Sequence, residues 1–132
     1  MRPARTEQAL RRRRDPVDLT GKRILLTGAS SGIGEAAAEK FARRGAKVVV
    51  AARRQKLLDA VVERIARNGG DATAHAVDLS DLDAIDELVA KVEHDLGGID
   101  ILVNNAARSI RRPLAESLDR WHDVERTMTL NY

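Results

Sequence analysis

The chain has 132 residues, the length of one small domain, and its 43% hydrophobic content excludes an extended disordered protein. It contains no cysteine, which excludes disulfide bonds and thiolate metal sites and fits the reducing cytoplasm. The longest apolar run, residues 48–52, is far shorter than the roughly 20 residues that span a bilayer, so no transmembrane segment is expected. We therefore expect a cytoplasmic domain whose core, with only 2% aromatic residues, is built from Ala, Val, Leu and Ile.

The net charge of +3 comes entirely from the first 19 residues, which hold six arginines against Glu7, Asp15 and Asp18. Residues 20–132 hold 17 basic and 17 acidic side chains and carry no net charge. We interpret residues 1–19 as a basic, disordered extension and residues 20–132 as the folded domain. An arginine cluster can also bind nucleic acid or an anionic surface, but a solvated extension is the commoner outcome.

From residue 20 onward, short apolar runs typical of buried strands alternate with segments of helical periodicity. Strands are predicted over 22–27, 47–52, 73–77 and 99–103, and helices over 33–44, 55–68, 82–96 and 117–132. Glycines end the first three helices, as C-terminal caps commonly do. This order predicts an α/β fold with a doubly wound parallel sheet that stops after about four strands.

Side chains at helical spacing predict which face of each helix points toward the core. Ile33, Ala37 and Phe41 form the predicted inner face of the first helix. Trp121 lies on the apolar stripe of the last helix and is predicted to be a core residue.

An acidic cluster precedes and opens the helix over 82–96. Ser80 followed three residues later by Asp83 predicts a variant of the capping box at its start. Acidic side chains in a first turn also suit the positive end of the helix dipole. No metal site is therefore expected here, nor from His75, His94 and His122, which lack metal-ligand spacing.

The most informative segment is the glycine-rich turn after the first strand. Gly28, Gly32 and Gly34 are spaced G-x-x-x-G-x-G, which lets the backbone turn tightly and approach a bound anion. The helix that follows points its positive N-terminus at the same place, and the Ser30 and Ser31 hydroxyls can donate to a phosphate. The turn therefore predicts a nucleotide-binding site.

Residues after the second strand indicate which nucleotide. In dinucleotide-binding folds an acid at this place accepts a hydrogen bond from the ribose 2′-OH, whereas an arginine accommodates a 2′-phosphate. This strand is followed by Arg53 and Arg54, with no acid. We therefore predict NADP rather than NAD as the cofactor, the alternative being two solvent-facing arginines at a helix start.

Three motifs together resemble those of the short-chain dehydrogenase/reductase family: T-G-x-x-x-G-I-G at residues 27–34, Asp78 after the third strand, and Asn104-Asn105-Ala106 after the fourth. The resemblance covers roughly residues 20–132 and implies a Rossmann-like fold and NAD(P)-dependent oxidoreductase chemistry. It also implies that Asp78 bonds the adenine amino group and that Asn131 is the asparagine of the catalytic tetrad. The family's N-N-A-G ends here in Ala107, whose methyl group predicts weakened cofactor binding. The cofactor-binding residues expected from the motifs and the resemblance are Gly28, Ser30, Ser31, Gly32, Ile33, Gly34, Arg53, Arg54, Asp78, Leu79, Asn105, Ala106 and Ala107.

The family pattern continues with a catalytic serine and a Y-x-x-x-K helix, whereas the one tyrosine of this sequence is Tyr132. We therefore expect residues 20–132 to be a dinucleotide-binding domain that is incomplete at its C-terminal end. It would be the cofactor-binding half of an NADP-dependent oxidoreductase that forms a homo-oligomer at full length. The alternative is a non-catalytic, truncated module that binds a nucleotide or polyanion, so whether the chain itself is an enzyme stays open.

The substrate that the resemblance implies is a small molecule with a carbonyl or alcohol group. Residues 108–112 are similar to the corresponding segment of some acyl-CoA and lipid-aldehyde reductases. This favours an acyl or lipid-derived substrate.

Overall fold

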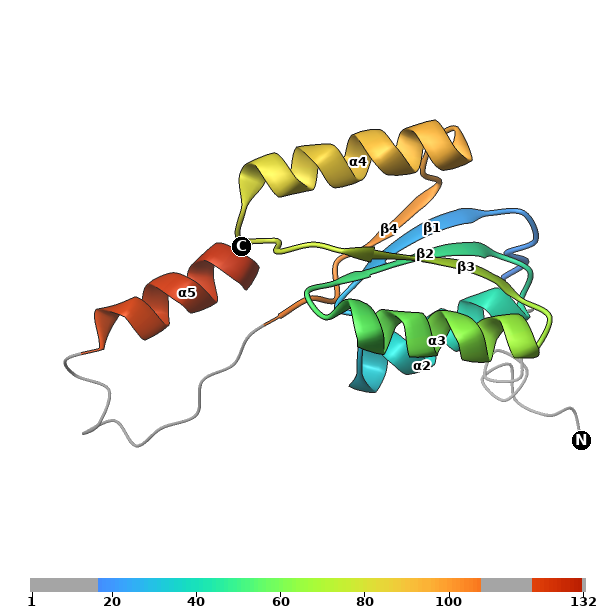
Figure 1. Cartoon of the computed structure of the whole chain (residues 1–132), viewed down its shortest axis with the longest axis horizontal. Helices are drawn as coiled ribbons and strands as arrows, with labels where there is room; N and C mark the ends of the chain where they lie inside the picture. Colours follow the sequence, from blue (N-terminus) through green and yellow to red (C-terminus); the bar gives the residue numbers. More distant parts are fainter. Residues whose placement is uncertain (1–16, 108–119, 132) are drawn as a thin grey trace, which may run out of the picture.

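Within the residues that the computed structural model describes, 17–107 and 120–131, four parallel strands form one sheet. They are β1 (Arg23–Thr27), β2 (Lys47–Ala52), β3 (Asp71–Ala76) and β4 (Ile101–Val103), in the spatial order β3-β2-β1-β4. The helices are α2 (Gly32–Arg43), α3 (Gln55–Arg67), α4 (Leu82–Leu96) and α5 (Trp121–Asn131). The predicted α/β, Rossmann-like architecture is confirmed (Figure 1).

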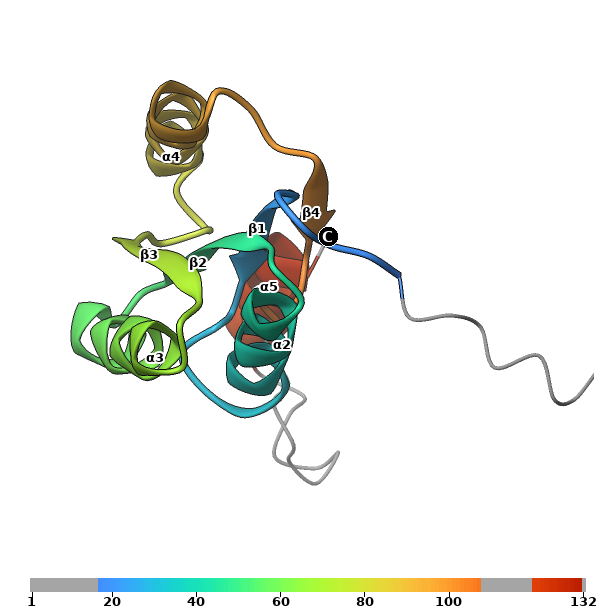
Figure 2. The same ribbon diagram turned by 90° about the vertical axis from the view of Figure 1, so that its right-hand side faces the viewer.

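Helices cover both faces of the sheet (Figure 2). On the face covered by α2 and α3, Ile24 and Leu26 of β1 belong to the same buried cluster as Val48 of β2. On the opposite face, Leu25 and Val49 belong to a second cluster with side chains of α4. Successive strand residues point to opposite faces, so a strand that is covered on both sides reads as a continuous apolar run. The doubly wound arrangement follows from these runs.

The inner face of α2 is formed by Ala38 and Ala42, which are buried, with Phe41 partly buried beside them. The predicted inward position of Ile33 is wrong, because that side chain is 82% exposed. Ile33 lies in the first turn of α2, next to the cleft described below, where the sheet no longer covers the helical stripe.

The bounds predicted for α4 are observed, but its predicted cap is wrong. Asp81 is the N-cap residue, and its carboxylate accepts hydrogen bonds from the backbone N–H groups of Asp83 and Ala84 at 3.1 and 3.3 Å. Ser80 instead donates its hydroxyl to the Asp78 carboxylate at 2.7 Å. Serine and aspartate are both good N-cap residues. Because the Ser80 hydroxyl bonds to the Asp78 carboxylate, Asp81 and not Ser80 caps the helix.

Three strands differ from prediction at their ends, and the first of them, β1, begins at Arg23 rather than at residue 22. β3 begins at Asp71, which pairs with Lys47 at the start of β2, and ends one residue before Val77. β4 begins at Ile101 rather than at residue 99. The Asp100 carboxylate accepts the backbone N–H of Arg23, the Asp100 N–H donates to the Arg23 carbonyl oxygen at 2.9 Å, and the paired residues of β1 and β4 then begin with Ile24 and Ile101.

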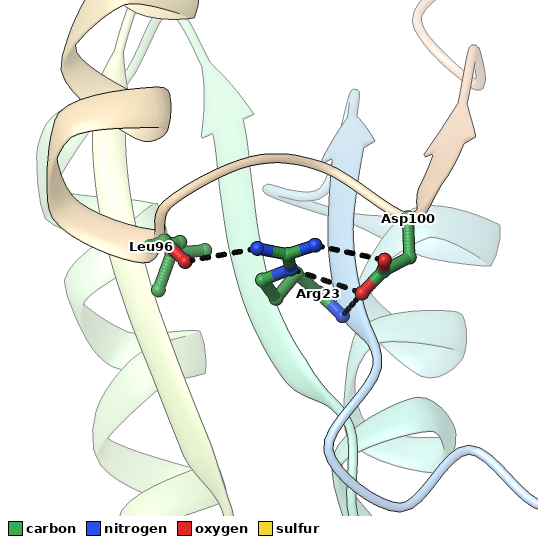
Figure 3. Close-up of polar contacts among 3 residues, drawn as sticks. All are labelled: Arg23, Leu96 and Asp100. Carbon is green, nitrogen blue, oxygen red and sulfur yellow. Dashed lines mark hydrogen bonds and ion pairs between the residues drawn. The ribbon is translucent and has the colours of Figure 1, made fainter.

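Arg23 and Asp100 form a clasp between the starts of β1 and β4 (Figure 3). The Arg23 guanidinium donates to both carboxylate oxygens of Asp100, at 2.9 and 3.0 Å, and to the carbonyl oxygen of Leu96 at 3.3 Å. These hydrogen bonds hold the pKa of the Asp100 carboxyl well below its usual range and raise the pKa of Arg23. The clasp ties the C-terminal end of α4 and the loop after it to the edge of the sheet.

The predicted last helix is observed as α5, which begins at Trp121; residues 117–119 and 132 lie outside the described residues. Trp121 is 75% exposed, so its predicted place in the core is wrong. The residue spacing of α5 does give the helix an apolar stripe that includes Trp121. However, α5 lies beyond the carboxyl ends of the strands and not on a face of the sheet, so the sheet does not cover this stripe (Figure 1). None of the helices described is both long enough and apolar enough to cross a membrane.

At the other end of the domain, Leu19 is 7% exposed and belongs to the core cluster under α2 and α3. The folded part thus includes a residue that was assigned to the basic extension. Residues 1–16 of that extension, and the segment 108–112, lie outside the described residues.

Candidate functional site

The sheet changes its winding direction at β1. The chain moves outward from β1 to β2 and β3 through α2 and α3, and then returns through α4 to β4, on the other side of β1. In open parallel sheets a crevice forms at such a switch point, outside the carboxyl ends of the strands. A cleft of about 680 Å³ lies at this place, and its lining comes from the segments after all four strands and from α5.

Thr27, the last residue of β1, joins the glycine turn to the end of β4. Its Oγ1 accepts hydrogen bonds from the backbone N–H groups of Asn105 and Ala106, both at 3.1 Å. The same hydroxyl donates to the Val103 carbonyl oxygen at 3.4 Å, and Thr27 is only 5% exposed. Asn105 returns a contact by donating from Nδ2 to the Gly28 carbonyl oxygen at 3.1 Å. One buried hydroxyl and one amide therefore hold two loops together.

Two glycines pack so tightly against these loops that no side chain fits. Gly28 has a φ of +67°, and a Cβ on it would lie 2.8 Å from the Ala106 Cα. A Cβ on Gly34 would lie 2.2 Å from the Gly28 carbonyl oxygen and 2.6 Å from the Asn105 Nδ2. The two loops can pack this closely only because neither glycine carries a side chain. Gly28 also lines the cleft, where the missing side chain permits the close approach that a phosphate requires.

The N-terminus of α2 opens at this turn without a side-chain cap. Ser31 is the N-cap residue, with extended backbone, and its side chain makes no capping hydrogen bond. The N–H groups of the first turn thus remain available to an anion, together with the hydroxyls of Ser30 and Ser31, which line the cleft. These features fit the pyrophosphate of a dinucleotide.

Two arginines follow β2 where the cleft meets α3. Arg54 is the N-cap residue of α3, its side chain makes no capping bond, and the first turn contains no acidic residue. Cations at a helix N-terminus are mildly unfavourable, because the helix dipole is positive at that end. An anion bound beside Arg53 and Arg54 would offset this repulsion.

Asp78 lines the cleft beyond β3. Its Oδ1 accepts hydrogen bonds from the Ser80 hydroxyl at 2.7 Å and from the Ser80 backbone N–H at 3.0 Å. These bonds, with a smaller contribution from the charge of Arg53, lower the pKa of the Asp78 carboxyl. Asp78 is therefore ionised at neutral pH and presents an acceptor to the cleft.

The structure places most of the predicted cofactor-binding residues around this one cleft. Gly32 and Gly34 do not line it and instead shape the turn, with Gly32 at a φ of +58°. Asn131 is the last residue of α5 and lies outside the lining, although Thr129 and Leu130 just before it contribute. The predicted residues that line the cleft are Gly28, Ser30, Ser31, Ile33, Arg53, Arg54, Asp78, Leu79, Asn105, Ala106 and Ala107.

Sequence reasoning missed several residues of the site. Thr27 was part of the motif but had no assigned role; its place directly before the first glycine was the available signal. Glu125 and Arg126 of α5 also line the cleft, and no motif marked them. No cluster of three or more potential metal ligands occurs in the described part of the chain.

Comparison with protein families matches residues 22–132 to the short chain dehydrogenase family. The chain is 65% identical to fatty acyl-CoA reductase Rv0547c of Mycobacterium tuberculosis, covering 100% of the chain and 46% of that protein. It is 48% identical to a fatty acyl-CoA reductase of Acinetobacter baylyi, covering 87% of the chain and 39% of that protein. The chain thus spans less than half the length of the curated relatives it matches.

Solved structures give the same result for the fold. A short-chain type dehydrogenase/reductase from Mycobacterium marinum has a TM-score of 0.80 at 37% identity, over 86% of this chain and 45% of that one. A metagenomic short-chain oxidoreductase in complex with NADP has a TM-score of 0.79 at 38% identity, over 87% of this chain and 52% of that one.

Proposed function

This chain belongs to the short-chain dehydrogenase/reductase family, and from that membership we propose that it is the cofactor-binding part of an NADP-dependent oxidoreductase. When bound, the nicotinamide of NADP(H) would donate a hydride to a carbonyl substrate or accept one from an alcohol substrate. The glycine turn and the uncapped start of α2 would hold the pyrophosphate, and Asp78 would accept from the adenine amino group. Asn131 is proposed to take the family's catalytic-tetrad position.

The choice of NADP rests on one observation, the charge at the end of β2. Arg53 and Arg54 both line the cleft there, and α3 begins with no acidic residue in its first turn. An acid at this place would accept from a ribose 2′-OH, whereas a guanidinium forms charge-assisted bonds with a 2′-phosphate. The solved short-chain oxidoreductase in complex with NADP, at 38% identity, supports the same choice.

For the substrate we propose an acyl thioester or the corresponding lipid-derived aldehyde. The support is the identity to two proteins named fatty acyl-CoA reductases, 65% in one case and 48% in the other. The same relatives favour the oxidoreductase over a non-catalytic nucleotide- or polyanion-binding module. Homo-oligomerisation and a cytoplasmic location stay predictions.

Titration of the chain with NADPH and with NADH tests the cofactor assignment. One charge-assisted contact to the 2′-phosphate is worth about 1.5–3 kcal/mol, so NADPH should bind roughly tenfold to hundredfold more tightly than NADH. Arg53→Asp should reverse that order. Arg44→Asp, the same charge change at the C-cap of α2 and away from the cleft, should leave the ratio unchanged. Equal affinities for the two cofactors, before and after Arg53→Asp, would rule out the assignment.

A further inference from the structure

A cluster of three charges joins α2 to α3. Arg64 of α3 donates from Nε to the Glu39 carboxylate at 2.9 Å and from a terminal nitrogen to the Glu35 carboxylate. The three side chains are partly covered, with 40% of Arg64, 34% of Glu35 and 23% of Glu39 exposed. One guanidinium is therefore shared by two carboxylates on a neighbouring helix.

Glu35 occupies a position where its charge affects the cleft. It lies in the first turn of α2, the helix whose uncapped N-terminus opens at the glycine turn. An acidic residue there stabilises the helix by its interaction with the dipole, but it also repels a phosphate bound at the same end. Side chains on a helix lean toward its N-terminus, so an unpaired Glu35 would bring its carboxylate closer to that phosphate.

We propose that Arg64 is a positioning residue for cofactor binding: by pairing with Glu35 it neutralises this acidic charge and holds it on the α3 side, away from the phosphate-binding end of α2. Arg64 does not line the cleft itself and acts through Glu35. The proposal rests on the proposed function, because it requires that α2 receive the phosphates of NADP(H).

The experiment measures NADPH dissociation constants of the whole chain by isothermal titration calorimetry for the wild type, Arg64→Gln, Glu35→Gln and the double variant. Arg64→Gln should weaken binding roughly two- to fivefold at low ionic strength, the effect of one charge about 5–10 Å from a phosphate in water. Glu35→Gln should instead tighten binding, by up to the same factor. The double variant should return close to the wild-type affinity.

A matched control and a salt series separate charge from packing. Arg67→Gln removes the same charge from the same turn of α3, but Arg67 pairs at 2.6 Å with Glu63 of its own helix, and both side chains are exposed. This variant should bind NADPH like the wild type. At about 1 M salt, where the Debye length is about 3 Å, the differences between all variants should disappear.

If Arg64→Gln and Glu35→Gln both weaken binding, and by a factor that salt does not change, the ion pair only packs α2 against α3 and the proposal is wrong. Unchanged affinity of Arg64→Gln overturns it as well. Should Arg64→Gln fail to fold by circular dichroism, Glu35→Gln decides alone, because unchanged or weaker binding contradicts the proposal. A wild type that does not bind NADPH refutes the proposed function itself.

Discussion

At the scale of single residues, Thr27 connects the strand end of β1 to the loop after β4. Its hydroxyl is the acceptor for two backbone N–H groups, and the residue is almost fully buried. A buried backbone N–H that loses its acceptor keeps the full cost of its desolvation. Replacing the Thr27 hydroxyl by a methyl group should therefore lower the free energy of unfolding. The two loops that Thr27 joins both contribute to the lining of the cleft, through Gly28 and through Asn105 and Ala106.

Thr27→Val keeps the shape of the side chain and removes the acceptor. We expect it to lower the free energy of unfolding by about 1–3 kcal/mol, measured by urea denaturation followed by circular dichroism. Thr27→Ser keeps the oxygen and loses one methyl group, so it should cost only about 0.8 kcal/mol. A smaller loss for valine than for serine would show that the hydroxyl does not hold the loops.

At the scale of the elements, the helices differ in how they begin. α2 and α3 start at the cleft with Ser31 and Arg54 as N-cap residues, and neither side chain makes a capping bond. α4 starts with Asp81, whose carboxylate accepts two N–H groups of the first turn. Uncapped N–H groups at α2 and α3 are available to a ligand, whereas α4 obtains its stability at this end from its own sequence.

Asp81→Ala should therefore destabilise the domain by about 0.5–2 kcal/mol, the usual cost of losing an N-cap side chain. Asp81→Asn should retain most of the stability, because asparagine caps about as well as aspartate. Ser80→Ala removes only an exposed bond to Asp78 and should cost less than Asp81→Ala in the same urea titration. A larger loss of stability for Ser80→Ala than for Asp81→Ala would show that Ser80 is the cap.

At the scale of the whole molecule, the pairing of β1 with β4 is held at both ends. Thr27 and Asn105 join the two strands at the carboxyl edge, beside the cleft. Arg23 and Asp100 join them at the opposite, amino edge, and the same arginine also reaches the C-terminal end of α4 (Figure 3). β4 has only three residues in the ladder, so these side-chain contacts supplement a short strand.

The clasp makes stability depend on pH in a defined direction. Because Arg23 lowers the pKa of Asp100 in the folded chain, the contribution is fully present above about pH 4, the ordinary carboxyl value, and is lost as the pH falls through the lowered value. Asp100→Asn should thus reduce the Tm at neutral pH. The difference from the wild type should narrow as the pH is lowered below about 4.

Thermal unfolding followed by circular dichroism across this pH range checks the expectation. Asp86→Asn, which removes an acidic charge from an exposed position of α4, should unfold like the wild type. A difference between Asp100→Asn and the wild type that stays constant in acid would mean that the charge of Asp100 does not stabilise the fold.

The sequence by itself determined the order of strands and helices along the chain. It also determined that the motifs meet at the carboxyl edge of the sheet. Apolar runs such as that of β2 are continuous because both faces of the sheet are covered, and this property is visible in the residues alone. Parallel strands place their carboxyl ends on one edge, so Gly28, Arg53 and Asp78 were expected together, and they line one cleft. The apolar runs and the shared edge are local or topological properties, and they can be predicted from the periodicity and spacing of residues.

Only the tertiary structure decided what covers each side chain and which distant groups bond. Ile33 and Trp121 lie on helical stripes, but a stripe does not specify its partner, and both side chains are exposed. The contacts of Thr27 with Asn105 and of Arg23 with Asp100 depend on the register that pairs Ile24 with Ile101. That register is a property of the assembled sheet, since it arises where residues far apart in the chain come into contact.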